Sequence, residues 1–289
     1  MSDTTSPIDI LVKAINAAGS QACIGIDPVF DKLPRSLRLE GELEAIEMFS
    51  LGLLDAIAGS ASVVKPQSAC FERYGAQGYA ILEKVIRKAR DLNMVVILDA
   101  KRGDIGSSAT HYAIGAANMG AQFITVSPYM GPSSIEPFLN AGLGVFALAR
   151  TSNPDSDEVQ LQELKDGGCV THGISKMIAD IGKDRIGTFG MSTLGAVVGA
   201  TKSADDVSTL RQIMPNQMFL VPGVGAQGGT INDVKPMIRP SAGSPGQLGV
   251  IVNASRSVIY AEPVGDESWL SAVKNAAVQF ADDLRSLVK

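Results

Sequence analysis

The stretch MVVILDAKRGDIG (94–106) joins a continuous apolar run to a cluster of charged residues. Its first five residues are all apolar, as expected for a parallel strand that is covered on both faces. Asp99, Lys101 and Asp104 follow, and the first two are spaced to share one face of a strand. Because an uncompensated charge is costly at a buried strand end, this cluster favours a functional site over a surface ion pair.

Seven further short apolar runs alternate with helical stretches along the chain. The eight predicted strands are 21–27, 62–67, 94–101, 122–128, 144–151, 195–201, 218–224 and 248–255, and the clearest predicted helices are 42–59, 78–93, 106–120, 132–142, 204–214 and 266–289. This alternation predicts an α/β fold, a (β/α)8 TIM barrel, with residues 1–289 forming a single domain. A doubly wound open sheet is the second choice, since no glycine-rich dinucleotide loop follows the first run.

The composition of the chain argues against some classes of binding partner. The net charge of −5 and the absence of a dense Lys/Arg run argue against a nucleic-acid surface. No apolar run approaches the roughly 20 residues that span a bilayer, and the N-terminus does not read as a signal peptide. Three scattered cysteines fit reduced thiols better than disulfides. We therefore expect a cytoplasmic protein without a membrane partner.

Polar residues end six of the predicted strands, and active sites of such barrels lie at the carboxyl ends of strands. These ends carry Asp27, Lys65, Asp99 with Lys101, Ser127, VPGVGAQGG (221–229) and NASRS (253–257). An arginine such as Arg256 can bind a phosphate through two charge-assisted hydrogen bonds. Taken alone, the glycines around Gln227 could form only a turn, and a Ser-Pro pair often only ends a strand.

Six segments in order carry a resemblance to a known family. DAKRGDIG (99–106), IGIDP (24–28), VKP (64–66), SPY (127–129), VPGVGAQGG and NASRS together resemble orotidine 5′-phosphate decarboxylases. The arginine and glycine after Lys101 are similar to the longer, bacterial-type branch of that family. The likeness covers nearly the whole chain.

The resemblance implies conversion of orotidine 5′-monophosphate to uridine 5′-monophosphate and carbon dioxide, without a metal or an organic cofactor. It implies that Lys101 protonates C6 of the ring and that Asp99 lies beside the substrate carboxylate. It also implies a homodimer, in which Asp104 reaches the neighbouring site. Further residues that it assigns to substrate are Lys65 and Asp27 at the ribose, Ile105 and Ser108 near the ring, Ser127 at the pyrimidine amide edge, and Pro222, Gln227 and Arg256 in and near the phosphate loop.

Three alternatives remain at this point. Magnesium-dependent sugar-phosphate decarboxylases and aldolases of similar barrels share the D-x-K-x-x-D pattern, but they need a further acidic ligand where this chain has Lys65. A Schiff-base aldolase needs an unprotonated lysine, whereas two neighbouring aspartates favour the protonated form of Lys101. A non-catalytic nucleotide-binding barrel would not need the charged array. His111 and His172 lack the neighbours of a metal site, so we expect no bound metal.

Overall fold

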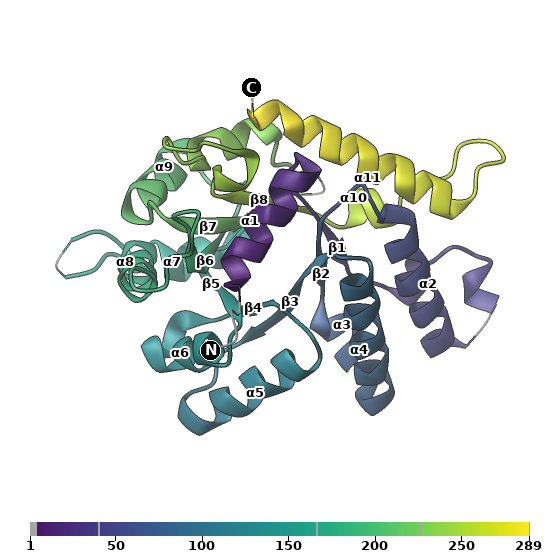
Figure 1. The fold of residues 1–289 in the computed structure, drawn as a ribbon, viewed down its shortest axis with the longest axis horizontal. Helices are drawn as coiled ribbons and strands as arrows, with labels where there is room; N and C mark the ends of the chain where they lie inside the picture. Colours follow the sequence, from purple (N-terminus) through teal and green to yellow (C-terminus); the bar gives the residue numbers. More distant parts are fainter. Residues whose placement is uncertain (1–4, 40, 166, 226, 289) are drawn as a thin grey trace.

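The computed structural model describes residues 5–39, 41–165, 167–225 and 227–288, which form a closed barrel of parallel strands surrounded by helices (Figure 1). Each strand pairs with its successor, and β8 pairs with β1. The predicted (β/α)8 barrel is therefore confirmed. The strands are β1 (Ala22–Ile26), β2 (Val63–Pro66), β3 (Val95–Arg102), β4 (Phe123–Val126), β5 (Gly144–Arg150), β6 (Ser192–Val198), β7 (Gln217–Val221) and β8 (Val250–Ala254).

Helices follow the strands around the outside of the barrel. The α-helices are α1 (Pro7–Ala18), α2 (Glu42–Ile57), α3 (Ser68–Glu72), α4 (Gly75–Asp91), α5 (Gly106–Asn118), α6 (Glu136–Asn140), α7 (Asp157–Gln160), α8 (Val170–Gly182), α9 (Ala204–Ile213), α10 (Arg256–Ile259) and α11 (Trp269–Arg285). Short 3₁₀ helices are η1 (Phe30–Lys32), η2 (Leu37–Leu39), η3 (Pro128–Met130), η4 (Pro132–Ser134), η5 (Pro154–Ser156), η6 (Ile231–Met237), η7 (Pro245–Gln247) and η8 (Ser286–Val288).

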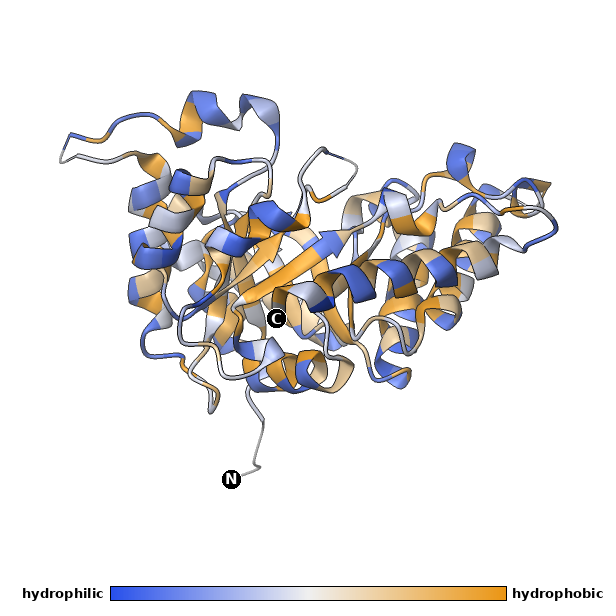
Figure 2. Cartoon of the chain, turned by 90° about the horizontal axis from the view of Figure 1, so that it is seen from above, coloured by the Kyte–Doolittle hydropathy of each residue, from blue (hydrophilic) through white to orange (hydrophobic). Residues whose placement is uncertain are grey.

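The apolar core has two parts, because each strand is buried on both faces. Figure 2 shows strands that are almost uniformly hydrophobic, inside helices whose faces alternate in hydropathy. One part fills the layer between strands and helices. The other fills the barrel interior, where Leu11 and Ile15 of α1 pack with Phe123 and Phe146. Helix α1 thus covers one end of the barrel, which leaves the carboxyl ends of the strands for a site.

The predicted strand at 195–201 is shifted in the structure, where β6 is Ser192–Val198. The predicted helix at 132–142 was wrong as a continuous element, because η4 ends at Ser134 and α6 begins at Glu136. Proline lacks a backbone N–H and is unfavourable inside a helix, so Pro137 favours a new helix that begins at Glu136. Most other predicted bounds agree to within a few residues.

Two of the longer helices, α1 and α8, were not predicted, and neither were the short helices α3, α7 and α10. Helix α1 has Pro7 at its start and is capped after Ala18 by Gly19, which adopts a left-handed φ of 62°. Helix α8 follows the segment 152–168, which was predicted as a loop and contains η5 and α7. The predicted N-cap of α9 is confirmed, since the Ser203 side chain accepts a hydrogen bond from Asp206 N–H. None of the helices in the described part of the chain is long and apolar enough to cross a membrane.

Candidate active site

A cavity of about 580 Å³ opens at the carboxyl ends of the strands. Residues from or just after all eight strands reach its wall. Eight of the predicted site residues line it together: Asp27, Lys65, Asp99, Lys101, Ser127, Pro222, Gln227 and Arg256. The closed topology explains this convergence, because parallel strands of one barrel end on the same face.

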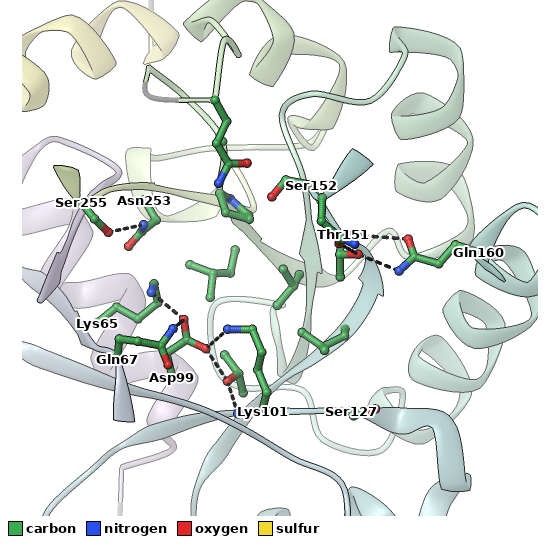
Figure 3. Close-up of a pocket in the computed structure, with 18 of the residues that line it drawn as sticks. Lys65, Gln67, Asp99, Lys101, Ser127, Thr151, Ser152, Gln160, Asn253 and Ser255 are labelled. Carbon is green, nitrogen blue, oxygen red and sulfur yellow. Dashed lines mark hydrogen bonds and ion pairs between the residues drawn. The ribbon is translucent and has the colours of Figure 1, made fainter. Parts of the chain in front are cut away.

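Asp99 is the centre of a hydrogen-bond network in this cavity (Figure 3). Its Oδ2 accepts hydrogen bonds from Lys65 Nζ at 2.7 Å and from Gln67 Nε2 at 3.2 Å. Its Oδ1 accepts from Lys101 Nζ at 2.6 Å and from Thr125 Oγ1 at 2.9 Å. Figure 3 shows the two lysines approaching the carboxylate from opposite sides. The carboxylate is therefore held by two cations and two neutral donors.

In this network, burial and the neighbouring charges have opposite effects on the pKa values of Asp99 and Lys65. Burial alone would raise the pKa of Asp99, but Lys65 and Lys101 lower it well below its usual value. Burial alone would lower the pKa of Lys65, but Asp99 and Asp27 raise it above its usual value. Both groups are therefore charged at neutral pH. Lys65 is nearly inaccessible, whereas about half of the Lys101 side chain, 49%, is exposed and available to a ligand.

The backbone at Lys101 departs from a regular strand. Its φ is +45°, a left-handed value that non-glycine residues rarely adopt. The pairing register of β3 with β4 also shifts here, between Leu98 and Arg102. Such conformations cost about 1–3 kcal/mol and occur most often at functional sites. The Lys101 side chain nevertheless reaches Asp99, as predicted. The contact is made by way of a bulge in β3, and not by the regular alternation of side chains along a strand.

Asp27 carries an unused hydrogen-bond acceptor. Its Oδ1 is buried and has no hydrogen-bond partner among the described residues, although its backbone oxygen accepts from the Tyr260 hydroxyl at 2.8 Å. A buried acceptor without a partner is costly unless a ligand supplies a donor. This atom therefore fits a ligand hydroxyl group.

The part of the cavity formed by the loops after β7 and β8 is suited to an anion. In the closed strand order, β7 lies across the barrel from β3. Pro222, Gly223 and Gln227 from one loop and Ser255 and Arg256 from the next line the cavity. The positive φ of Gly223, 104°, turns the first of these loops. A guanidinium group beside this turn is a suitable ligand for phosphate, and phosphate sites of such barrels lie in these loops.

Comparison with known proteins agrees with this geometry. The model of the orotidine 5′-phosphate decarboxylase / HUMPS family matches residues 45–268, which include the Asp99 network and both loops. The chain belongs to this family.

Full-length relatives of the decarboxylase family resemble the whole chain. The orotidine 5′-phosphate decarboxylase of Paracidovorax citrulli is 39% identical, with 96% of this chain and 98% of that protein aligned. The enzyme of the same name from Rhodopirellula baltica is 37% identical, with 94% and 96% aligned. A crystal structure of a Streptomyces avermitilis protein, to which the same activity is ascribed, matches with a TM-score of 0.83 and 34% identity, covering 100% of this chain and 97% of that one.

Three residues that the decarboxylase resemblance assigned to the site do not line this chain's own cavity. They are Asp104, Ile105 and Ser108, just before and within the first turn of α5. Asp104 Oδ1 accepts a hydrogen bond from Ile105 N–H at 2.8 Å, and Ile105 is 51% exposed. All three side chains are thus accessible to a second molecule.

Sequence reasoning missed part of the decarboxylase cavity, the segment that follows β5. Thr151, Ser152, Asn153 and Gln160 line the cavity, and Gln160 accepts from Thr151 N–H at 3.0 Å. The available signal was the polar sequence after the apolar run 144–149, a strand end like the other six. Gln67, Thr125 and Asn253 were also missed, although each lies on or beside a predicted strand end.

A cluster of charged residues around the buried Arg150 anchors this segment. Arg150, 3% exposed at the end of β5, donates to Asp157 Oδ1 at 2.6 Å and to Asp206 Oδ2 at 2.7 Å. Lys202 Nζ also donates to Asp157, at 2.8 Å. The cluster ties α7 to the loop before α9, and so it fixes the cavity wall that Thr151 to Gln160 form.

Proposed function

We propose that this chain catalyses the decarboxylation of orotidine 5′-monophosphate to uridine 5′-monophosphate and carbon dioxide, the last step of de novo synthesis of that nucleotide. The observation that carries the proposal is the buried Asp99 carboxylate between Lys65 and Lys101, across the barrel from Gln227 and Arg256. Membership of the decarboxylase family supports the same assignment. A cytoplasmic location would suit this activity and the three free thiols in the described chain.

The charged array suits a reaction that leaves negative charge on a ring carbon. The bond between C6 and the carboxylate breaks, carbon dioxide leaves, and the electron pair stays at C6. The ammonium group of Lys101 stabilises this charge electrostatically and then donates its proton to C6. Lys101 afterwards regains a proton from solvent. No step of this scheme requires a metal or an organic cofactor.

Asp99 has two roles in this scheme. It orients Lys101 through a 2.6 Å hydrogen bond, and it places a negative charge beside the substrate carboxylate. We propose that Lys65 and the unpartnered Asp27 Oδ1 bind ribose hydroxyls. Arg256 and Gln227 bind the phosphate, whose binding energy holds the ring against the array. Pro222 supplies an apolar contact beside them.

The pyrimidine amide edge has two candidate hydroxyl groups. Ser127 follows β4 and was predicted from the sequence, whereas Ser152 follows β5 and was found only in the structure. Ser152 lies beside the phosphate loop, since a Cβ added at Gly223 would be 3.5 Å from Ser152 Cβ. Because Ser152 lines the cavity beside the loop that we propose to bind the phosphate, we favour Ser152 for this contact.

A homodimer would complete the site. Asp104, Ile105 and Ser108 do not line their own cavity, and exposed apolar residues lie near the same edge of the barrel. Tyr129 is 84% exposed and Met130 is 53% exposed, both in the loop after the adjacent strand β4. We propose that this edge binds a second copy, so that Asp104, Ile105 and Ser108 contact the substrate bound by the partner.

Mixing two inactive variants tests this arrangement. Lys101→Ala and Asp104→Ala should each be inactive alone, because each removes a group from every site. Unfolding and refolding them together should restore up to about a quarter of the wild-type activity, since half of the dimers would carry one intact site. Activity that stays at the level of the single variants, in a mixture shown to contain hybrid dimers, would contradict the shared site.

The activity itself is tested by following loss of the orotate absorbance in metal-free buffer with a chelator. Wild-type protein should turn over, and Lys101→Ala should lose turnover while still binding uridine 5′-monophosphate. Lys84→Ala is the matched control, because Lys84 pairs with Glu47 on the surface and 58% of its side chain is exposed. Folded wild-type protein without turnover, or turnover of a sugar phosphate that chelation abolishes, would refute the proposed function.

A further inference from the structure

Thr125 occupies an unusual position opposite the bulge in β3. The register pairs Leu98 with Ile124 and Arg102 with Val126, so Thr125 alone faces the three residues from 99 to 101. On its other side, Thr125 pairs regularly with Phe146 of β5. Thr125 is 1% exposed. One residue in a regular strand therefore faces the whole irregular stretch that carries Asp99 and Lys101.

The Thr125 hydroxyl makes two hydrogen bonds to this stretch. It accepts from the backbone N–H of Lys101 at 2.9 Å and donates to Asp99 Oδ1 at 2.9 Å. The same Oδ1 accepts from Lys101 Nζ. The hydroxyl thus takes the place of a backbone acceptor that a regular β3–β4 pairing would offer to the Lys101 N–H. It also binds Asp99 Oδ1, the oxygen that orients the Lys101 ammonium group.

A threonine side chain suits this task because its β-branched carbon has few accessible rotamers. Its position is set by buried neighbours on β4 and β5 and does not depend on substrate. Without the hydroxyl, the Lys101 N–H would lose its acceptor, and the left-handed φ of 45° would lose one of the contacts that hold it. The bulge would then relax, and the ammonium group would move relative to the ring.

We propose that Thr125 is a positioning residue of the decarboxylation, whose hydroxyl holds the β3 bulge so that Lys101 and Asp99 face C6 and its carboxylate. This inference rests on the proposed function. It assigns Thr125 no contact with the reacting atoms, and its effect reaches the substrate only through Asp99 and Lys101. The predicted signature is a loss of turnover without a loss of nucleotide binding.

Thr125→Val tests the proposal, because valine keeps the shape and removes the hydroxyl. We expect kcat to fall by about 100-fold, the scale of an error of about 1 Å in the position of a catalytic group. KM and the Kd of uridine 5′-monophosphate should change by less than about threefold, because binding that is equal in ground and transition states is retained. Thr125→Ser keeps the hydroxyl and should recover most of the lost kcat.

Thr171→Val is the matched control. Thr171 is also fully buried, and its hydroxyl makes one hydrogen bond, to the backbone oxygen of Ala149 at 3.3 Å. Its kcat should stay within about threefold of wild type. If Thr125→Val is not recovered as folded protein, Thr125→Ala repeats the test with less steric demand.

The outcomes separate this inference from the proposed function. Wild-type protein that is inactive on orotidine 5′-monophosphate refutes the proposed function. With active wild-type protein, the role of Thr125 is refuted if Thr125→Val keeps kcat within about threefold, or if Thr125→Ser is as impaired as Thr125→Val. It is also refuted if nucleotide binding weakens as much as kcat falls. A crystal structure of Thr125→Val should show Lys101 with a changed φ.

Discussion

Replacing Asp99 by Asn should destabilise the fold, because it removes the charge that compensates Lys65. The two side chains are 7% and 6% exposed, and their charged atoms are 2.7 Å apart. Removing one partner of a buried ion pair costs about 3–5 kcal/mol. The NH2 group of Asn adds a second problem, because it would face either Lys65 and Gln67 or Lys101 and Thr125, all of which donate hydrogen bonds to Asp99.

The loss of stability should depend on pH. In the wild type, burial opposes the charged form of Lys65, but Asp99 and Asp27 raise its pKa. A raised lysine pKa contributes stability that is fully present below about pH 10 and is lost as the pH rises further. Without Asp99, only Asp27 and the smaller effect of Cys23 oppose burial, so the pKa of Lys65 should fall below its unfolded value. The variant then gains stability as the pH rises towards about 10.

Urea unfolding of both proteins at about pH 7 and at about pH 9.5 measures this effect. The difference in the free energy of unfolding should be about 3–5 kcal/mol at the lower pH and smaller at the higher one. Asp55→Asn is the control, because Asp55 pairs with Lys88 while 58% exposed, and its loss should cost less than about 1 kcal/mol. An Asp99→Asn variant as stable as wild type at neutral pH, or a difference that widens in alkali, would refute the reasoning.

Three further predictions concern binding. Arg256→Gln should lower kcat/KM by about 10²–10⁴-fold in steady-state assays, since two charged hydrogen bonds of about 1.5–3 kcal/mol each are lost; a change below about tenfold would place the phosphate elsewhere. Ser152→Ala should raise KM more than Ser127→Ala, and the reverse order would assign the amide edge to Ser127. Arg150→Met should raise KM and speed proteolysis between Thr151 and Gln160, because that segment loses its anchor; unchanged proteolysis would contradict this.

The strand ends were predictable because a closed parallel barrel brings them together whatever their order in the chain. Asp27, Lys65, Asp99 and Arg256 each follow a short apolar run, and all four line one cavity. The fold therefore converts separate sequence signals into one site. Only local apolar patterning and the topology were needed for this part.

The wall after β5 was only partly predictable, because its polar strand end is visible in the sequence but the contacts that hold the following segment are not. Thr151 and Ser152 are ordinary loop residues, and their place in the cavity depends on Arg150, whose acidic partners Asp157 and Asp206 lie on separate segments. Apolar periodicity does not encode such long-range ion pairs. The outward position of Ile105 has a similar cause, because in the proposed dimer its function depends on a surface of another molecule.

The spacing of Asp99 and Lys101 correctly predicted that their side chains meet, but the strand geometry assumed in that prediction was wrong. On a regular strand, residues i and i+2 have side chains on the same face. However, β3 is irregular at this point, and Lys101 has a φ of 45°. Local residue preferences would not choose this conformation, which costs about 1–3 kcal/mol and persists only where the surroundings impose it. Two hydrogen bonds impose it here. The Thr125 hydroxyl accepts from the backbone N–H of Lys101, and the Asp99 carboxylate accepts from the Lys101 ammonium group. In a regular strand, the Lys101 N–H would pair along the β4 ladder and would not need the Thr125 side chain. The bulge therefore makes the position of Lys101 depend on Asp99 and Thr125, the contacts that should also set where the proton is delivered.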